Sequence, residues 1–296
     1  METIAASDQR HLRSVAYKLL GSMADAEDMI QETYLRWYRL TPVERAGIDE
    51  PLAWQTRVLS RLCIDTLRSA RHRKETYVGE WLPEPVPSSA STFRTSVEEE
   101  DPLDRISVDD SVSMALMIVL DSMTPAQRVA FVLHDIFQYP FPEVAQVVGR
   151  SPESCRSLAS AARKRIRNAT AGQTSREEHR RINRAFKTAW TTGRIDELIS
   201  LLDPRATAVT DGGGQVSAAL EPLHGATAIA EFFADIFRRQ PNLEVQEATV
   251  NGEPGLLGTV DGTTVAVLST RAISSGITDI WVIRNPEKLY AWNSLH

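Results

Sequence analysis

Two kinds of side chain in this sequence could do chemistry, and they lie in different parts of the chain. The last third contains residue types that serve as general bases, namely Asp211, His224, Asp261 and Asp279. No pair among them has a spacing that specifies a reaction. Basic side chains are instead concentrated at the ends of two helical patterns, where they could contact phosphates and base edges of a nucleic acid.

Residues 143–158 have the spacing of a helix-turn-helix. Ala145 is small where two helices must approach closely, and Gly149 follows where the turn favours a positive φ. Ser151 can cap the second helix, with Pro152 in its first position. The alternative is a structural helical hairpin with a solvated basic face. As a DNA reader, the second helix would present these side chains to the major groove: Ser151, Glu153, Arg156, Ser157, Ser160 and Lys164.

Composition divides the chain into four segments. Residues 1–75 and 111–171 carry apolar residues at helical spacing and end in basic turns. Residues 76–110 are rich in Pro, Ser and acidic side chains, which predicts a linker with too few apolar groups to order itself. Residues 176–296 pass from helical periodicity to strand alternation, which predicts strands at 263–268 and 277–283. The expected fold is multidomain, with two all-α domains, the second containing the helix-turn-helix, followed by an α+β domain.

Length, charge and cysteine usage set further bounds. A chain of 296 residues is long enough for two or three domains. The net charge of -6 argues against a nucleic-acid binder that acts alone, so the distribution of charge matters more than its sum. Cys63 and Cys155 are far apart and no Cys/His cluster is present, which predicts no disulfide, metal site or cofactor. The longest apolar stretch, 112–120, is too short for a membrane span, which predicts a cytoplasmic protein without a membrane partner.

The motifs, in this order, resemble the extracytoplasmic-function (ECF) class of bacterial sigma factors. Residues 115–167, with the helix-turn-helix, are similar to sigma domain four. The first segment is similar to sigma domain two in four stretches. These are RHLR from Arg10, DAED from Asp25 with Gln31 and Glu32 after it, PLAW ending at Trp54, and RLCIDTLRS from Arg61.

Three further stretches resemble the signatures of an ECF subgroup with a SnoaL-like C-terminal extension, whose cone-shaped fold is related to nuclear transport factor two (NTF2). Gln215 and Glu287 stand where Lys and Asp are expected, but they have similar hydrogen-bonding capacity. Cys155, Arg156 and Ser160 also depart from the expected types, which leaves the promoter preference open. The signatures comprise Trp81, Leu82, Pro83, Glu84 and Pro85; Asp211, Gly212, Gly213 and Gly214; and Asn285, Pro286, Glu287, Lys288 and Leu289.

The resemblance implies a sigma factor, which directs core RNA polymerase to promoter DNA and has no catalytic residue. The polymerase would be contacted through its large-subunit clamp helices and its flap. For Trp37 and Trp54, core packing is an equal alternative to partner contact. The polymerase-binding residues would be Asp28, Gln31, Glu32 and Trp37. The minus-ten element would be melted and held by Trp54, Arg57, Arg61, Asp65, Arg68 and Arg71, and the helix from Ser151 would read the minus-thirty-five element.

The resemblance also implies that the C-terminal domain gates the activity in cis, with the three signatures joining it to the linker. Asp211 to Gly214 would form a glycine-rich turn whose backbone N–H groups approach a partner surface, the alternative being a plain hairpin loop. A small ligand in a pocket of this domain is a further partner that the resemblance allows. The competing hypothesis is a helix-turn-helix regulator fused to a ligand-binding or cyclase- or isomerase-like enzyme. Only a sigma factor needs the N-terminal polymerase-binding domain that the resemblance identifies, so the sigma factor is favoured over this hypothesis.

Overall fold

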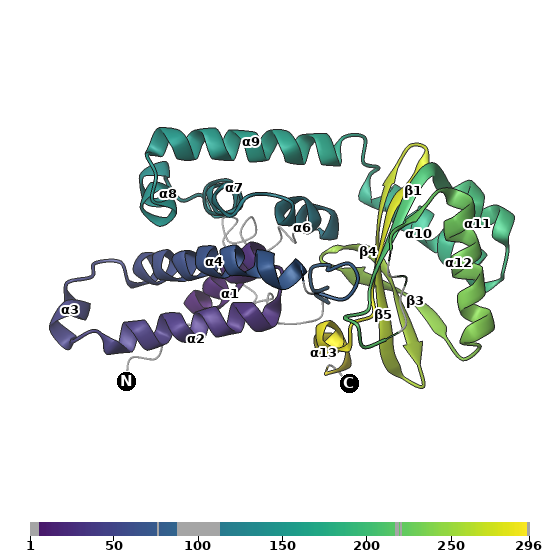
Figure 1. The fold of residues 1–296 in the computed structure, drawn as a ribbon, viewed down its shortest axis with the longest axis horizontal. Helices are drawn as coiled ribbons and strands as arrows, with labels where there is room; N and C mark the ends of the chain where they lie inside the picture. The colour runs from purple at the N-terminus through teal and green to yellow at the C-terminus, as the bar shows by residue number, and fades with distance from the viewer. Residues whose placement is uncertain (1–5, 76, 88–112, 217–218, 220, 295–296) are drawn as a thin grey trace. The chain divides into compact units, whose positions relative to one another are not determined.

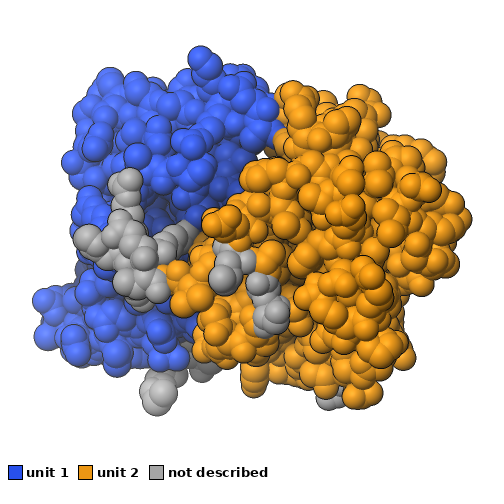
Figure 2. All heavy atoms as spheres, turned by 45° about the vertical axis from the view of Figure 1, so that its right-hand side comes forward, with its two compact units in different colours: residues 1–75, 92–110, 116–169 blue, residues 76–91, 111–115, 170–296 orange. Residues whose placement is uncertain are grey.

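The computed structural model describes residues 6–75, 77–87, 113–216, 219 and 221–294. The chain, whose fold is drawn in Figure 1, divides into two compact units, which Figure 2 shows in blue and orange. The first consists of Met1–Glu75, Thr92–Asp110 and Leu116–Ala169, and its described elements are helices. The second consists of Thr76–Ser91, Ser111–Ala115 and Thr170–His296, and it contains the β-sheet.

Helices of the first unit begin where the sequence supplies caps. Ser22 accepts a hydrogen bond from the backbone N–H of Asp25, and Thr124 and Gln127 form a reciprocal capping box. Apolar side chains such as Leu12 have no exposed surface and form the core between helices. The elements are α1 (Ala6–Leu20), α2 (Met23–Arg39), α3 (Pro42–Ala46), α4 (Pro51–Glu75), α6 (Met114–Asp121), α7 (Pro125–Phe131), the π-helix η1 (Val132–Ile136), α8 (Phe141–Val148) and α9 (Pro152–Thr170).

The helix-turn-helix is formed by α8 and α9, where the spacing predicts it. Gly149 ends α8 with a φ of 72°, and a Cβ at this position would meet no atom within 4 Å. The left-handed backbone, rather than a lack of space, therefore requires glycine. Ser151 caps α9 by accepting from the N–H of Ser154 at 3.2 Å. Val144 of α8 and Cys155 of α9 are fully buried between the helices.

The second unit is built on a six-stranded sheet with the order β2-β1-β6-β5-β4-β3. β1 pairs with β6 in parallel, and the other neighbours are antiparallel. Helices α10, α11 and α12 cover one face of the sheet (Figure 1), with Phe186 and Phe233 at the centre of the core. The elements are α10 (Arg176–Thr191), α11 (Ile195–Leu201), β1 (Leu202–Asp211), β2 (Leu223–His224), α12 (Ala226–Arg239), β3 (Glu244–Val250), β4 (Glu253–Val260), β5 (Thr263–Ile273), β6 (Gly276–Ile283), the 3-10 helix η2 (Pro286–Leu289) and α13 (Tyr290–Asn293).

Residues 77–87, the start of the predicted linker, are ordered as part of the second unit. The backbone N–H of Asn251 donates to the carbonyl of Val86, and the N–H of Val86 donates to Oδ1 of Asn251, both at 2.9 Å. Pro87 forms an antiparallel bridge with Val250, at the end of the edge strand β3. This stretch is therefore ordered by contact with the sheet rather than by a core of its own. The rest of the predicted linker, residues 88–110, lies outside the described residues.

The predicted fold class is confirmed, because helical domains precede a mixed α+β domain. The strands predicted at 263–268 and 277–283 fall within β5 and β6. Among the described residues, no helix is long and apolar enough to cross a membrane.

Candidate nucleic-acid interface, linker clasp and pocket

The predicted minus-ten residues form a stripe along α4. Arg57, Arg61, Asp65 and Arg68 follow one another at spacings of three or four residues, which places them on one face of the helix. Arg61, Asp65 and Arg68 are exposed, and Arg68 pairs with Asp65 at 3.3 Å. α4 extends through Arg71, whose side chain lies outside the described residues. The stripe has both the charge and the exposure that contact with a phosphate backbone requires.

Part of this α4 stripe is bonded to the helix-turn-helix of the same unit. Nη1 of Arg57 donates to the side-chain Oε1 of Gln146 at 3.0 Å, and Nη2 of Arg61 donates to the backbone carbonyl of Gln146 at 2.7 Å. Gln146 lies on α8 and is exposed. No feature of the sequence pointed to Gln146, because the contact joins residues more than 80 positions apart. A nucleic acid on the α4 stripe would have to replace these two bonds.

The predicted recognition residues share the exposed face of α9. Ser151, Glu153, Arg156, Ser157, Ser160 and Lys164 are all exposed, while Cys155 and Ala159 face the core. Arg156 pairs with Glu153 at 3.4 Å and lies 5.4 Å from the ring centroid of Phe141. Both contacts are at the surface, so they leave the guanidinium accessible to a base edge or phosphate.

The predicted polymerase-binding residues of α2 separate into a surface group and a core residue. Asp28 and Gln31 are exposed, and Glu32 pairs with Arg36 at 3.0 Å. Trp37 is only 7% exposed and packs on Trp54, with 5.3 Å between ring centroids. The sequence prediction missed two exposed apolar residues on the face of Asp28 and Gln31. These are Leu35, which is 52% exposed, and Tyr38, which is 47% exposed. The signal for them was the same spacing of three and four residues.

A buried carboxylate joins residues 77–87 to the C-terminal sheet. Asp211, at the end of β1, has no exposed surface. Its Oδ1 accepts from the hydroxyl of Tyr77 at 2.6 Å, and its Oδ2 accepts from the backbone N–H of Leu82 at 2.9 Å. The ammonium of Lys288 lies 2.6 Å from the same Oδ2 and also donates to the carbonyl of Leu82. We call Tyr77, Leu82, Asp211, Asn285 and Lys288 the linker clasp.

The Trp-Leu-Pro-Glu-Pro stretch packs over this clasp. Leu82 is 4% exposed and is the buried anchor, whereas Trp81 is half-buried and places its ring centroid 4.2 Å from the Lys288 ammonium. Pro83, Glu84 and Pro85 are also buried. The indole Nε1 of Trp292 donates to the carbonyl of Pro85 at 2.9 Å. The stretch is therefore held to the C-terminal domain by a buried side chain and by hydrogen bonds to its backbone.

Tyr77 is a clasp residue that the sequence prediction missed. It donates to Asp211 and accepts from the side-chain Nδ2 of Asn285 at 2.9 Å. Burial raises the pKa of Tyr77, and the hydrogen bond to the Asp211 carboxylate raises it further, because both oppose a phenolate here. A tyrosine next to a basic helix end carries no sequence signal for such a role.

The glycine-rich turn at residues 211–214 allows a close approach of neighbouring side chains, because its glycines have no Cβ. The N–H of Gly213 donates to Oδ1 of Asp211 at 3.1 Å, so the aspartate caps its own turn. A Cβ on Gly213 would lie 2.5 Å from Nδ2 of Asn285. The predicted close approach is found at Gly214, where a Cβ would lie 2.9 Å from Cβ of Val78 in the linker. The hydrogen bonds to the linker are accepted by the side chain of Asp211.

The third signature, residues 285–289, meets this turn, and so do Gln215 and Glu287, the two residues that differ from the expected types. Oδ1 of Asn285 accepts from the N–H of Glu287 at 3.0 Å and so begins η2, with Pro286 as its first residue. Nε2 of Gln215 donates to Oε1 of Glu287 at 2.9 Å, so the two residues that differ from the expected types are hydrogen-bonded to each other. Lys288 and Leu289 are buried, and Gly212 is buried behind them.

The candidate general bases are not brought together. Asp211 belongs to the clasp, and Asp279 pairs with Arg271 at 2.7 Å. His224 is exposed on the short β2, and Asp261 is exposed in a turn. Within the described ranges, no group of three or more His, Cys, Asp or Glu residues could hold a metal ion.

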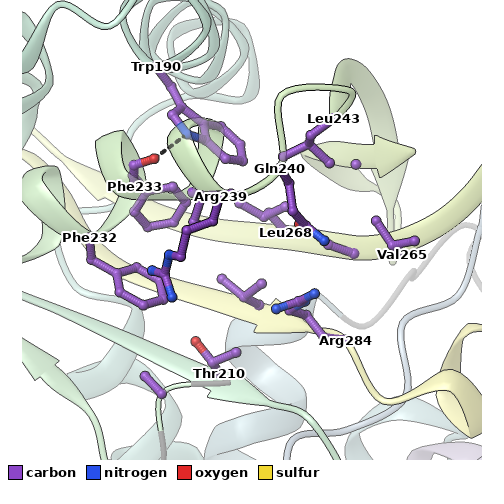
Figure 3. Close-up of a pocket in the computed structure, with 15 residues that line it drawn as sticks. Trp190, Thr210, Phe232, Phe233, Arg239, Gln240, Leu243, Val265, Leu268 and Arg284 are labelled. Atoms are coloured by element: carbon purple, nitrogen blue, oxygen red, sulfur yellow. Dashed lines mark hydrogen bonds between the residues drawn. The ribbon is translucent and has the colours of Figure 1, made fainter. Parts of the chain in front are cut away.

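A pocket of about 250 Å³ lies between α12 and the helix-covered face of the sheet (Figure 3). Its apolar walls include Trp190, Phe232 and Phe233. The indole Nε1 of Trp190 donates a hydrogen bond to the carbonyl of Phe233 at 2.8 Å. Its charged lining residues are Arg239, from the last position of α12, and Arg284, which follows β6. No carboxylate or imidazole is among the described residues that line it.

Comparisons with known proteins identify the family. The sigma-70 region 2 family model matches residues 4–73, and the sigma-70 region 4 model matches residues 113–166. The ECF RNA polymerase sigma factor SigJ of Mycobacterium tuberculosis is 39% identical over 95% of this chain and 90% of its own length. The probable ECF sigma factor SigI of the same species is 33% identical over 94% of this chain and 91% of its own length. The crystal structure of SigJ matches with a TM-score of 0.73 and 35% identity over 97% of both chains.

The chain therefore belongs to the ECF RNA polymerase sigma factors, in the subgroup with a SnoaL-like C-terminal extension. It acts in transcription initiation by binding RNA polymerase and promoter DNA. The family is not enzymatic. The competing hypothesis of a helix-turn-helix regulator fused to an enzyme is not favoured, because residues 4–73 match sigma-70 region 2.

Proposed function

We propose that three exposed helix faces divide the work of initiation. The α2 face around Asp28 and Gln31 binds the clamp helices of the polymerase large subunit, with Leu35 and Tyr38 as its apolar contacts. The α4 stripe melts and holds the minus-ten element, and the exposed face of α9 reads the minus-thirty-five element. The domain with the helix-turn-helix also binds the polymerase flap. Exposure, charge and helical spacing of these residues support the assignment.

The proposed domains are 1–75 and 111–171 for the two sigma domains, 76–110 for the linker and 176–296 for the regulatory domain. The regulatory domain gates promoter use in cis. It does so by holding the start of the linker, which fixes how far the two sigma domains can separate. The observation that carries this proposal is the buried Asp211 carboxylate, which accepts from the linker at Tyr77 and at Leu82.

The contact of Arg57 and Arg61 with Gln146 supports the same mechanism. It occupies part of the α4 stripe while the helix-turn-helix lies against it. DNA binding requires these bonds to exchange for phosphate contacts. The clasped linker favours the closed arrangement, and release of the linker favours the open one. A small ligand in the C-terminal pocket is the proposed input to this balance, which the largely apolar lining of the pocket supports.

A reversible covalent lock tests the gating. Pro87 and Val250 are bridge partners, and Cα atoms so paired lie ~4.5–5.5 Å apart, within the range that a disulfide spans. The double variant Pro87→Cys/Val250→Cys is compared oxidised and reduced in run-off transcription with core polymerase. We expect the oxidised form to give less promoter-dependent transcript, because its linker remains held. The reduced form of the same preparation is the matched control for folding.

Each single cysteine variant controls for effects of the oxidant on the native thiols Cys63 and Cys155, both of which are buried. Equal transcript from the locked and reduced forms would refute gating by the linker. Such a result would leave the polymerase-binding and DNA-binding assignments standing.

The reading of the minus-thirty-five element has its own test. Arg156→Ala should cost ~1–3 kcal/mol of promoter binding on the matched element and little on a scrambled one, if the guanidinium reads a base edge. Arg167→Ala, exposed on the same helix, is the control for phosphate contact and should weaken both promoters alike. An equal loss for Arg156→Ala on both elements would refute its role in reading.

A further inference from the structure

The guanidinium of Arg156, the proposed reader of a base edge, has two neighbours from different helices. One is the carboxylate of Glu153, which lies on α9 itself and accepts a hydrogen bond at 3.4 Å. The other is Phe141, the first residue of α8, whose ring centroid lies 5.4 Å from the guanidinium carbon. This distance is within the ~6 Å over which an aromatic face attracts a cation.

The two contacts have different consequences for DNA binding. A carboxylate occupies N–H donors, and guanine is read by two N–H groups of one guanidinium. An aromatic face attracts the positive charge through its quadrupole and leaves the N–H groups at the edge of the guanidinium free. The contact with Phe141 can therefore persist while Arg156 contacts a base, whereas the bond to Glu153 competes with that contact.

The ring of Phe141 is itself held in place by a second ring. His134 stacks on it with 3.8 Å between ring centroids and 27° between the ring planes. Nδ1 of His134 donates to the backbone carbonyl of Tyr139 at 2.9 Å. Because a carbonyl can only accept, Nδ1 carries the proton in this bond, which fixes the orientation of the imidazole. The stack therefore gives the Phe141 ring a defined orientation, although this side chain is only partly buried.

The turn that supplies His134 also contacts α9. His134 lies on the π-helix η1, and its neighbour Asp135 pairs with Arg163 of α9 at 2.7 Å. Gln138 follows η1 with a φ of 60°, and its Nε2 donates to the carbonyl of Asp135 at 3.1 Å. A π-helical turn is rare, and a left-handed residue other than glycine is costly, so both persist where surrounding contacts maintain them. These contacts join η1 to α8 through the stack and to α9 through the ion pair.

We infer that Phe141 is a positioning residue for the reading of the minus-thirty-five element. Its ring, stacked on His134, orders the guanidinium of Arg156 before DNA binds, so that less rotamer entropy is lost in the complex. Phe141 is not one of the buried residues between the two helices, such as Val144 and Cys155, so it is not needed to fill that core. The inference rests on the proposed role of Arg156 and adds a side chain that acts through it.

Promoter binding by holoenzyme, assembled from core polymerase and the full-length protein, tests this role. Wild-type holoenzyme first selects its preferred promoter from a pool randomised at the minus-thirty-five element, and a scrambled element serves for comparison. Phe141→Leu keeps an apolar side chain of similar size but removes the ring. We expect it to weaken binding to the selected promoter by about two- to fivefold, as for one exposed cation–π contact, and to leave binding to the scrambled promoter unchanged. Phe141→Tyr keeps the ring and should bind as tightly as wild type.

The double variant Phe141→Leu/Arg156→Ala is the matched control. If Phe141 acts through Arg156, the double variant should bind the selected promoter as Arg156→Ala does. A further loss in the double variant, an equal loss by Phe141→Leu on both promoters, full affinity of Phe141→Leu or weak binding by Phe141→Tyr would each overturn the positioning role. A selective loss in Arg156→Ala would then still support reading by Arg156. An equal loss by Arg156→Ala on both promoters would refute the reading role and this inference with it.

Discussion

The linker clasp and the α4 stripe are both polar contacts, but burial makes them different kinds of contact. Asp211 and Lys288 are 0% and 8% exposed, whereas Arg61 and Gln146 are at the surface. Water can replace either partner of the surface contact, so its net contribution to stability is small. In the clasp, a charged group that loses its partner remains buried and unhydrated unless the chain rearranges, so the loss is costly.

This difference shows which contact can act as the slow step of opening. In the proposed mechanism, the arginines of α4 exchange Gln146 for DNA phosphates when DNA binds, because their bonds are exposed. Opening of the clasp must separate Asp211 from the Leu82 N–H and the Tyr77 hydroxyl, and Lys288 from the Leu82 carbonyl, in one event. The clasp is thus suited to set the population of the open form, and the stripe to respond to it.

The largest effect is expected when the clasp loses its carboxylate. Asp211→Ala leaves the ammonium of Lys288 buried with no counter-charge from the aspartate, which should destabilise the second unit by ~3–5 kcal/mol. Urea unfolding, with hydrogen exchange of β1 and of residues 77–87 as the local probe, measures the loss. The exchange of these segments should accelerate far more than that of α1 or α2.

The double variant Asp211→Ala/Lys288→Met removes both charges and provides the control. It should recover a large part of the lost stability, because an apolar residue of similar length replaces the unpaired ammonium. A loss below ~1 kcal/mol in the single variant would place the clasp among surface contacts and remove the difference between the two regions.

Two glycines with the same left-handed backbone allow a second comparison of the regions. Gly149 and Gly213 have φ values of 72° and 64°. Alanine at either position should cost ~1–2 kcal/mol for the backbone alone. A Cβ meets nothing within 4 Å at Gly149 but lies 2.5 Å from Asn285 at Gly213. We expect Gly213→Ala to exceed Gly149→Ala by a further ~1–3 kcal/mol in urea unfolding. Equal costs would indicate that the clasp yields without strain.

The sequence predicted the helix-turn-helix and the strands β5 and β6, because each carries a local signal. Gly149 and Ser151 mark the turn and cap of the helix-turn-helix, and the alternation in β5 and β6 marks the strands. The order of the linker start was not predicted. Residues 77–87 contain apolar side chains such as Trp81 and Leu82, but their order depends on backbone bonds to Asn251 and on the clasp, which are contacts distant in sequence.

For the candidate site, surface residues were easier to predict than paired ones. The α9 and α4 residues follow from helical periodicity, which fixes the side of the helix on which each residue lies. Gln146 and Tyr77 were missed because neither is distinguished by its neighbours in the sequence. Their roles depend on partners more than 80 positions away.

Alkaline pH should weaken the clasp through Tyr77. The folded state raises the pKa of this phenol, so its contribution to stability is complete below the unfolded pKa of ~10 and is lost as the pH rises beyond it. Tyr77→Phe should cost ~1 kcal/mol near neutral pH, because two hydrogen bonds are lost. The stability difference between wild type and Tyr77→Phe should then shrink between about pH 9 and pH 11.

Urea unfolding of both proteins across this range is the measurement. The difference between them cancels the contributions of Tyr34 and Tyr139, whose pKa values burial also raises. Tyr290→Phe, at a residue that is 74% exposed, is the control for removal of a phenol outside the clasp. A difference that stays constant with pH would show that Tyr77 ionises without affecting the clasp.

The smallest effect is expected from Gln146→Ala in the surface contact. This change removes the Oε1 acceptor of Arg57 and keeps the backbone carbonyl that accepts from Arg61. Because both partners are accessible to water, the free energy of unfolding should change by less than ~1 kcal/mol. Run-off transcription should stay the same or rise slightly, since one competitor for the α4 stripe has been removed while every proposed DNA contact remains. A loss of stability as large as that of Asp211→Ala would contradict the comparison directly, because an exposed amide would then hold its partner as strongly as a buried ion pair.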